Sequence, residues 1–520
     1  MKNMYLLSLL VLAMICGMNP VSANTYAVIS PLDLTINDSG CLRWAMHKAE
    51  MNPGPDTVAF NIAGPLPIIM NIFSPLSLDS ANYNGDGTFI NGGSQPAPVV
   101  YGTAPRIVLK GPGPQPTCLM IHARNVKVTG LCITNWQQFG IAIMPGADGF
   151  IIGDSAHGNF ICNITLASAN GISITAAGNG KIQGNRIGVD TSGMTSQPTG
   201  SGIIISGALS NHILIGGSFN GQGNIISGQR NQSKNIIVDG GKNISIIGNI
   251  IGCNRLGGLI DSANTLIGIN LKNGADSCII GGSNPNEGNI IAYNMETLAF
   301  AGGGVIVDGS NFARISHNQI YCNGHSGGIQ LINNGNGNYA APLIMSANSG
   351  GAVGTGLAGS VIELFYNNSG CALSTQTCSG AVYAGTTTVD IFGNWAYVGY
   401  LDAAFSLTAT AADPVSGNTS PFAPCALILF TTDVPSVTPY GSYSVYPNPF
   451  NTFTQIKVDN SLLNAGCVLT ITDISGRELR SINIINPTTE INKEEMAAGI
   501  YFYNLITREG KAGSGKLVIQ

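Results

Sequence analysis

Between Gly140 and Gly328 the chain repeats a short pattern in which a Gly or Asn is followed by alternating aliphatic residues. Seven copies occur, namely GIAIM, GISIT, GIIIS, NIIVD, GINLK, GVIVD and GIQLI. They start at positions 140, 171, 202, 235, 268, 304 and 328, so the intervals are 31, 31, 33, 33, 36 and 24 residues. Alternation with a period of two predicts strands, and repetition at this length predicts a β-solenoid.

A second phrase, Gly-Asn-x-Ile, recurs inside each unit. It begins at Gly158, Gly184, Gly223, Gly248 and Gly288, and an altered copy begins at His317. A third apolar stretch lies between the two phrases, which gives three short strands per turn. This is the composition of a coil in a right-handed parallel β-helix.

Stacked parallel strands lie about 4.8 Å apart, so equivalent positions in successive coils form columns. We expect the isoleucine of each Gly-Asn-x-Ile phrase to point inward and its asparagine to form a ladder at one corner. An asparagine suits that corner because its amide both donates and accepts hydrogen bonds. The predicted ladder, a structural feature, consists of Asn159, Asn185, Asn224, Asn249, Asn289 and Asn318.

The insertions alternate between coils. One set of coils carries a loop before Gly-Asn (DSAHG, GSFNGQG and GSNPNEG), and the intervening coils lengthen after it (VDTSGMTSQPTG and CNRLGGLIDSANTL). The unit of duplication is therefore two coils, and the loops should form two separate rows.

The ends of the chain differ from the repeats. Residues 1–23 are typical of a secretory signal peptide, with Lys2, an apolar run and Val21-Ser22-Ala23 before Asn24. An apolar helical stripe from Leu42 to Ala49 predicts a capping helix that Asn52-Pro53-Gly54-Pro55 ends. We expect the solenoid to cover residues 24–340.

Beyond the solenoid, alternating strands over residues 341–430 have the spacing of a sandwich. They resemble a small immunoglobulin-like module. A linker rich in Thr, Pro and Ser then covers residues 431–443. The predicted fold is all-β: a right-handed parallel β-helix followed by two small β-sandwich domains.

Composition narrows the classes of function. Only 9% of the residues are charged, the net charge is -5 and the isoelectric point is near 5.7, so no feature indicates nucleic-acid binding. The apolar runs after the leader are too short for a transmembrane span. No Cys or His cluster has the spacing of a metal site, and we predict no cofactor. Calcium stays open, because the loop carboxylates Asp190, Asp261 and Glu287 are isolated.

Five cysteines lie in or just after solenoid strands, where a thiol fills space as a small apolar group. They are Cys132, Cys162, Cys253, Cys278 and Cys322. Cys371 and Cys378 flank a turn-like segment and are the predicted disulfide pair of an exported chain.

The helical cap, the Gly-Asn-x-Ile coils and the phrases of the type IGG followed by GNIIS together resemble a family of secreted bacterial right-handed β-helix proteins with pectin-lyase-like architecture. The resemblance covers roughly residues 35–340. It implies the fold more strongly than an activity, because the family includes lyases, glycosidases and surface proteins with no known reaction.

The C-terminal stretch carries YPNPFN at 446–451, LTITDISGREL, MAAGIYFYNLITREG and the terminal GKLVIQ. These blocks, in this order over residues 444–520, resemble the C-terminal sorting domain of the type nine secretion system. The resemblance implies export through the periplasm to the outer surface or beyond, with the secretion machinery as a partner. We expect the terminal strand, Lys516 to Gln520, to remain available for recognition.

One column on the first strand of each coil contains Asp239, Lys272 and Asp308 on three successive coils. An ammonium between two carboxylates suits β-elimination, and a separated Asp pair suits inverting hydrolysis. The alternative is a surface ladder of ion pairs, in which alternating signs remove repulsion. Three aromatic residues, Phe219, Tyr293 and Tyr321, are the candidates for stacking against sugar rings.

A second group with acid and base side chains is Arg314, His317, Tyr321 and His325. Because His317 replaces the Gly of the Gly-Asn phrase, we expect its side chain at the ladder corner, in a structural role or at the surface.

Two functions follow from the sequence. The first is a cell-surface or secreted scaffold that binds or displays an extracellular polysaccharide or another surface ligand. The alternative is an exported polysaccharide lyase or glycoside hydrolase with Asp239, Lys272 and Asp308 at its centre.

Overall fold

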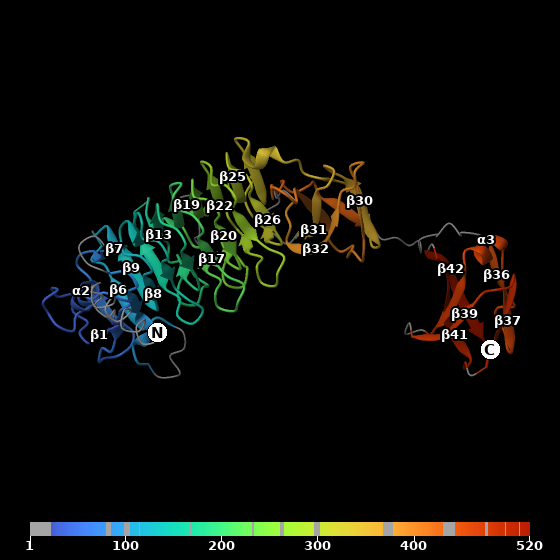
Figure 1. The fold of residues 1–520 in the computed structure, drawn as a ribbon, viewed down its shortest axis with the longest axis horizontal. Coiled ribbons are helices and arrows are strands. Elements are labelled where there is room, and N and C mark those ends of the chain that lie inside the picture. The colour runs from blue at the N-terminus through green and yellow to red at the C-terminus, as the bar shows by residue number, and fades with distance from the viewer. Residues whose placement is uncertain are drawn as a thin grey trace, which may run out of the picture. The chain divides into compact units, whose positions relative to one another are not determined.

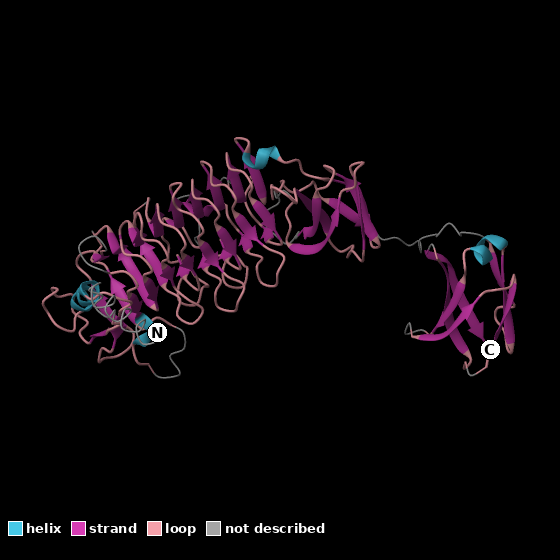
Figure 2. Cartoon of the chain, viewed as in Figure 1, coloured by secondary structure: helices cyan, strands magenta, loops and turns pink. Residues whose placement is uncertain are grey.

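The computed structural model describes residues 22–520 except 80–84, 98–103, 114, 167, 231–232, 261–264, 296–301, 368–377, 430–441, 474–476, 495 and 509. The chain divides into two compact units, residues 1–430 and 431–520. Figure 1 shows the first unit as a long solenoid with a smaller group of strands at its C-terminal end, and Figure 2 shows that strands and loops make up nearly all of it, with little helix. The predicted signal peptide falls mostly outside the described residues, as does nearly all of the predicted linker.

Three long parallel sheets form the solenoid, and each coil contributes one short strand to each sheet. Sheet A contains β1 (Thr25–Val28), β2 (Thr57–Phe60), β5 (Phe89–Asn91), β8 (Lys127–Thr129), β11 (Ile151–Ile152), β14 (Lys181–Ile182), β17 (Leu214–Gly216), β20 (Ser245–Ile247), β23 (Ile279–Gly281) and β26 (Arg314–Ser316). Sheet B contains β3 (Ile68–Asn71), β6 (Ile107–Lys110), β9 (Leu131–Trp136), β12 (Phe160–Ile164), β15 (Arg186–Ile187), β18 (Ile225–Ile226), β21 (Ile250–Ile251), β24 (Ile290–Ala292) and β27 (Gln319–Tyr321). Sheet C contains β4 (Leu76–Leu78), β7 (Thr117–Ile121), β10 (Phe139–Ile143), β13 (Asn170–Thr175), β16 (Ser201–Ser206), β19 (Ser233–Asp239), β22 (Thr265–Lys272), β25 (Gly303–Asp308) and β28 (Ile329–Ile332).

The strand register confirms the predicted right-handed parallel β-helix. Ile187 pairs with Ile226, Ile226 with Ile251, and Ile251 with Ile291, so residues 25 to 40 positions apart are direct neighbours. In Figure 1 the labelled strands of sheet C follow one another along the solenoid in the order β7, β13, β19, β22 and β25. Coils are also present before residue 140, although the sequence repeat is weak there. This is shown by β1, β2 and β5, which continue sheet A.

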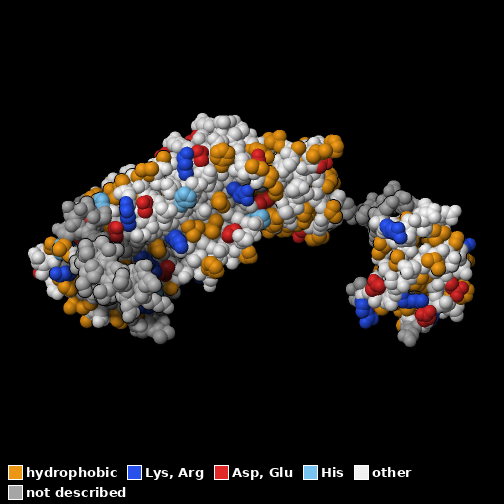
Figure 3. Space-filling model, viewed as in Figure 1, with side chains coloured by type: hydrophobic (Ala, Val, Ile, Leu, Met, Phe, Trp, Pro, Cys, Tyr) orange, Lys and Arg blue, Asp and Glu red, His pale blue; other side chains and the backbone are white. Residues whose placement is uncertain are grey.

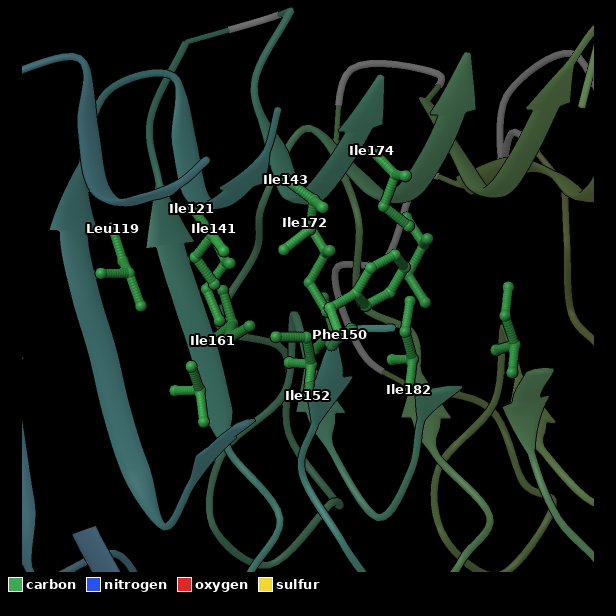
Figure 4. Close-up of a cluster of buried hydrophobic side chains, with 14 of the residues drawn as sticks. Leu119, Ile121, Ile141, Ile143, Phe150, Ile152, Ile161, Ile172, Ile174 and Ile182 are labelled. Atoms are coloured by element: carbon green, nitrogen blue, oxygen red, sulfur yellow. The ribbon is translucent and has the colours of Figure 1, made fainter. Parts of the chain in front are cut away.

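A single apolar core runs through the solenoid from Val28 to Ile329. Figure 4 shows part of it, where Ile152, Ile161, Ile172 and Ile182 from neighbouring coils point into the same interior. Stacked isoleucines fill this space because β-branched side chains pack well on pleated strands. Phe150 lies among them and is fully buried.

The predicted capping helix is present as α2 (Leu42–Met51) at the N-terminal end. Its buried positions include the expected Leu42, Ala45, Met46 and Ala49, and all four belong to the solenoid core. The helix therefore keeps water from the first coil.

A β-sandwich follows the solenoid, as predicted. Its strands are β29 (Leu343–Asn348), β30 (Gly351–Thr355), β31 (Val361–Asn367), β32 (Val382–Thr388), β33 (Asn394–Val398), β34 (Ser406–Ala412) and β35 (Ala426–Leu429). A short 3-10 turn, η3 (Gly335–Asn338), precedes them, and another, η1 (Gly92–Ser94), lies in an early coil. Ile362, Leu364, Trp395 and Leu407 are buried in the sandwich core.

The sandwich also closes the C-terminal end of the solenoid, which the sequence did not indicate. The backbone N–H of Ile315 in β26 donates to Thr419 Oγ1 at 3.0 Å, and that of Ile320 in β27 donates to the Gly380 carbonyl at 2.7 Å. Phe422 packs against the solenoid core. The last strands of sheets A and B are thus bonded by sandwich residues, as a further coil would bond them.

The disulfide prediction was wrong in its pairing. Cys378 is bonded to Cys425, 47 residues later, and Cys371 lies outside the described residues. The short spacing from Cys371 to Cys378 was a poor guide because the fold brings the segment after β34 beside Cys378. Cys322, expected as an apolar filler, is also disulfide-bonded. Cys253 and Cys278 are buried free thiols, and burial raises the pKa of each to about 12.

The second unit has two antiparallel sheets around its own core. One sheet holds β36 (Tyr443–Tyr446), β37 (Phe453–Val458) and β40 (Thr488–Asn492), and the other holds β38 (Val468–Thr472), β39 (Glu478–Asn483), β41 (Gly499–Thr507) and β42 (Gly510–Ile519). A short helix, α3 (Asn460–Asn464), connects β37 to β38.

The terminal strand of this unit is not available along its length, contrary to our expectation. Within β42, Lys516 pairs with Phe502 and Leu517 pairs with Tyr501. Leu517 and Ile519 point into the core because strand side chains alternate between faces. Lys516 and Gln520 remain exposed.

Candidate functional site

The six predicted ladder asparagines lie in one hydrogen-bonded column. Asn224 Oδ1 accepts from the backbone N–H of Asn185 at 2.9 Å and from its side-chain amide at 3.0 Å. Asn224 Nδ2 donates in turn to Asn249 Oδ1 and to the Ile182 carbonyl. The same pattern links Asn159 to Asn185, Asn249 to Asn289 and Asn289 to Asn318.

A glycine precedes five of the six ladder asparagines, and the physical reason for it differs between the two sets of coils. In the coils with loops, a Cβ at Gly158 would lie 1.7 Å from the Gly184 carbonyl oxygen, so only glycine fits. In the intervening coils, Gly184 and Gly248 have φ angles of 69° and 66°, which favour glycine. His317 occupies the equivalent left-handed position with a φ of 54°. The backbone requirement at this glycine therefore alternates from coil to coil, with the same two-coil repeat as the loops.

Hydrogen bonds between the loops and the neighbouring coils follow the same two-coil repeat. The N–H groups of Gly130, Gly184 and Gly248 donate to the carbonyls of His157, Gln222 and Glu287, each located in the loop of the next coil. At His317 no further loop follows, and its N–H donates to Glu363 Oε2 of the sandwich at 3.0 Å. Glu363 thus takes the place of a loop carbonyl.

The structure brings Asp239, Lys272 and Asp308 into the expected column on sheet C. Asp239 pairs in register with Lys272, and Lys272 with Asp308. Lys272 Nζ lies 2.9 Å from Asp239 Oδ2. Asn273 donates to Asp239 at 2.7 Å, and Asn333 donates to Asp308 at 2.6 Å. Both carboxylates are thus held by an amide from the next coil.

The surroundings of Asp239 do not favour its use as an acid or base near neutral pH. Burial opposes ionisation of Asp239, but hydrogen bonds from Asn273 and Lys272 outweigh it and hold the pKa of that carboxyl below its ordinary value. On the face shown in Figure 3, charged side chains of the solenoid are scattered, without a large patch of one sign.

The second predicted group does not form one cluster around a shared centre. His317 Nδ1 lies 3.0 Å from Glu363 Oε1, and the imidazole stacks on Tyr383 with ring centres 4.2 Å apart. The hydrogen bond to Glu363 raises the pKa of His317 above its ordinary value, against the opposing effect of burial. Tyr321 Oη donates instead to the Gly257 carbonyl at 2.7 Å, and Arg314 and His325 are exposed.

Sheet B presents a different surface, which the sequence analysis missed. Its outward column pairs Phe160 with Arg186, then Arg186 with Ile225, and ends at Gln319. Between them, Ile225, Ile250 and Ile290 lie on successive coils and are half-buried, while the isoleucine after each is fully buried. Three outward isoleucines in a row form an apolar strip on the outside of the solenoid.

Loops border this strip on both sides. The first row, which we call the ladder-side loops, runs up to the Gly of each Gly-Asn phrase and comprises residues 153–158, 217–223 and 282–288. The second row, which we call the far-side loops, follows sheet B and comprises residues 188–199 and 252–260. A Cβ at Gly193 would lie 2.9 Å from Ile225 Cδ1, and one at Gly257 would lie 4.0 Å from Ile290 Cγ2. Figure 2 shows loops projecting in rows along the solenoid.

The sheet B trough is the name we give to this strip and its two rows of loops. Two hollows lie in it, against the ladder-side loops. Hollow I, of about 510 Å³, has Ile225 and Ile250 on its floor and Phe219 in its wall. Hollow II, of about 500 Å³, has Ile250, Ile290 and Gln319 on its floor. Among the residues that line the two hollows, His317 is the single titratable side chain.

Candidate cation ligands are not gathered together. Within the described part of the chain, no group of three His, Cys, Asp or Glu side chains is placed to hold a metal ion. The Asp190 carboxylate accepts hydrogen bonds from Ser192, Met194 and Thr195 of its own turn. The Glu287 carboxylate is bonded to Asn284, and Asp261 lies outside the described residues.

The second unit can be assigned by comparison with known families. Residues 444–520 match the family described as "Secretion system C-terminal sorting domain". This unit is a type nine secretion sorting domain. The sorting domain implies interaction with the secretion machinery and export to the cell surface or the extracellular space. In the described residues, no helix has the length and apolar character needed to cross a membrane.

The other comparisons give only distant likenesses. No curated protein sequence matches the chain. Among solved structures, an endo-xylogalacturonan hydrolase from Aspergillus tubingensis is 10% identical over 59% of this chain and 91% of that chain, with a TM-score of 0.27. A biofilm associated protein, in its BSP domain, is 14% identical over 35% of this chain and 29% of that chain, with a TM-score of 0.13. Dimeric latent PorU from Porphyromonas gingivalis is 16% identical over 35% and 19%, also with a TM-score of 0.13. Such likenesses carry no argument about function.

Proposed function

We propose that the exported protein is a binding scaffold, in which the solenoid and sandwich display a surface for an extracellular polymer or another surface ligand. The observation that carries this proposal is the sheet B trough, an apolar strip bordered by two rows of loops. Contiguous apolar surface rimmed by polar residues is typical of interaction sites, and here the three half-buried isoleucines form that surface between the loops.

The sorting domain supplies the route to the site of action. By the family resemblance, it is recognised in the outer-membrane machinery and removed, and the remaining protein is anchored or released. Deletion of residues 444–520 in a host with a type nine secretion system should leave the protein inside the cell. Surface or medium localisation of the deleted form would contradict this part of the proposal.

The alternative function, a polysaccharide lyase or glycoside hydrolase, would use Asp239, Lys272 and Asp308. The ion pair between Lys272 and Asp239, together with the amide donated to each Asp, favours the structural interpretation of this column. An acid or base with a pKa close to the working pH would be expected of the catalytic pair.

The experiment that separates these functions uses the purified full chain and a panel of uronate and neutral glycans. Retention on immobilised polymers and release of unsaturated products or new reducing ends are measured in parallel. We expect retention without turnover. Turnover that is lost in Asp239→Ala and Asp308→Ala would establish the enzyme instead, and neither retention nor turnover would reject both functions.

A further inference from the structure

The two hollows of the sheet B trough are copies of one another, shifted by two coils. The ladder-side loops that wall them read GGSFNGQGNII at 216–226 and GGSNPNEGNII at 281–291. Several residues that line hollow I have an equivalent two coils later that lines hollow II. These pairs are Ser218 and Ser283, Ile225 and Ile290, Gly248 and His317, and Ile250 and Gln319. Their volumes are about 510 and 500 Å³.

The opposite side of the trough repeats with the same shift. Gly193 lies close to Ile225, and Gly257 lies close to Ile290. Equivalent far-side loops are therefore next to equivalent isoleucines. The two loops are joined because the N–H of Arg255 donates to the Gly193 carbonyl at 2.9 Å. Floor and both walls therefore share one period, which is roughly 9.6 Å for two coils.

A surface with a fixed period along a line fits a ligand with the same period. An extended peptide repeats every two residues, at roughly 6.8 Å, and would fall out of step with the hollows. The disaccharide unit of an extended β-1,4-linked glycan has a length close to that of two coils. The spacing thus favours a glycan over a peptide.

The chemistry of the hollows favours a glycan without charge. Hollow I is lined by Gly, Ser, Asn, Ile and Phe residues alone. The amides of Asn220 and Asn286 are exposed and both donate and accept, as sugar hydroxyls require. Phe219 is 76% exposed, and the isoleucine floor offers apolar contact to the faces of sugar rings. The glutamate of the second loop is engaged with Asn284 of its own turn.

We propose that hollows I and II are successive subsites for a neutral, unbranched β-1,4-linked glycan that lies along the solenoid axis over Ile225, Ile250 and Ile290. This inference rests on the proposed binding function and names its ligand. It places the ligand on sheet B, whereas the column of Asp239, Lys272 and Asp308 lies on sheet C.

The test is calorimetric titration of the full chain with β-1,4-linked gluco-oligosaccharides, as dimer, tetramer and hexamer. We expect affinity to rise by about tenfold or more from the dimer to the tetramer, because the longer chain contacts both hollows. α-1,4-linked gluco-oligosaccharides and oligogalacturonates of the same lengths test linkage and charge. Tighter binding of either series than of the β-1,4-linked series would overturn the ligand assignment.

Two pairs of variants place the ligand. Ile250→Asp puts a charge on the floor that both hollows share, and Ile279→Asp makes the same change on the outward face of sheet A. Phe219→Ala shortens a wall residue that is 76% exposed, and Leu209→Ala is its control at 71% exposure. We expect Ile250→Asp and Phe219→Ala to weaken binding by about tenfold or more and the controls to leave it unchanged.

Equal affinities in a variant and its control would contradict the location. Circular dichroism shows whether Ile250→Asp folds. If it does not fold, Phe219→Ala still tests the location of the ligand. If none of these oligosaccharides binds but the chain is retained on another polymer, the ligand assignment fails and the proposed function stands. If the chain binds no polymer, both fail.

Discussion

Asn224 donates a hydrogen bond from Nδ2 to Oδ1 of Asn249 at 2.9 Å, although the two residues are 25 positions apart in the chain. Both side chains are buried, and each also bonds to backbone groups. Together with the equivalent contacts of the other ladder asparagines, this contact helps to hold successive coils in register.

Replacing a ladder asparagine should therefore be costly. Asn224→Ala leaves the N–H of Asn185 and the carbonyl of Ile182 without their buried partner. We expect a loss of about 2–4 kcal/mol in the free energy of unfolding, from about 1–3 kcal/mol for each unsatisfied group and some relaxation. Urea unfolding followed by circular dichroism measures it. Asn220→Ala, an exposed loop residue, is the control, and a similar loss in both would contradict the structural role of the ladder.

The disulfide between Cys378 and Cys425 should stabilise the sandwich. It closes a loop of 47 residues, for which a chain-entropy estimate gives about 4 kcal/mol. We expect Cys425→Ser to lower the melting temperature of the first unit, whereas Cys467→Ser, a free buried thiol of the second unit, leaves it unchanged. Peptide mapping under non-reducing conditions checks the pairing, and a peptide joining Cys371 to Cys378 would contradict it.

The junction between solenoid and sandwich should depend on pH through His317. Its hydrogen bond to Glu363 raises the pKa of His317 in the folded protein above the ordinary value of 6.5. A raised folded pKa means that the extra stability is fully present below pH 6.5 and is lost as the pH rises through the folded value. The groups that face the imidazole are Glu363 on β31 and Tyr383 on β32, with Ser316 beside it.

This pH effect is measured as the melting temperature of the first unit from pH 5.5 to 8.5. We expect Glu363→Gln to flatten the decline above pH 6.5, because Gln carries no charge to favour the imidazolium. Glu287→Gln, whose carboxylate is bonded to Asn284, serves as control. A decline that is the same in wild type and Glu363→Gln would show that another group titrates.

The ion pair on sheet C should matter little to stability. The side chains of Lys272 and Asp239 are 33% and 30% exposed, and ion pairs of this kind contribute roughly 0–1 kcal/mol. We expect Lys272→Met to change the free energy of unfolding by no more than about 1 kcal/mol. A loss of several kcal/mol in urea unfolding would mean that the column is buried or more tightly coupled than its geometry indicates.

Sequence reasoning succeeded where one physical constraint repeats in each coil. The inward isoleucines, the Asn224 column and the register of Asp239 with Lys272 follow from a period that strand stacking enforces. The helix α2 was predictable for a similar reason, because its apolar stripe has the spacing of a helix.

The remaining features depend on contacts between segments that share no period. Glu363 replaces a loop carbonyl at His317 across 46 residues, and the Cys378–Cys425 pairing depends on the path of the sandwich strands. The trough did leave a signal, since Ile225, Ile250 and Ile290 are apolar residues at positions that alternate to the outside. We assigned the inward isoleucine of each phrase to the core and did not consider the residue before it.

The most direct test of the binding account is a crystal structure of the full chain with a β-1,4-linked gluco-tetrasaccharide. We expect electron density for the sugar chain along sheet B, over Ile225, Ile250 and Ile290, with one disaccharide unit in each hollow. Density on sheet C beside Asp239, Lys272 and Asp308 would contradict the account and favour the enzyme.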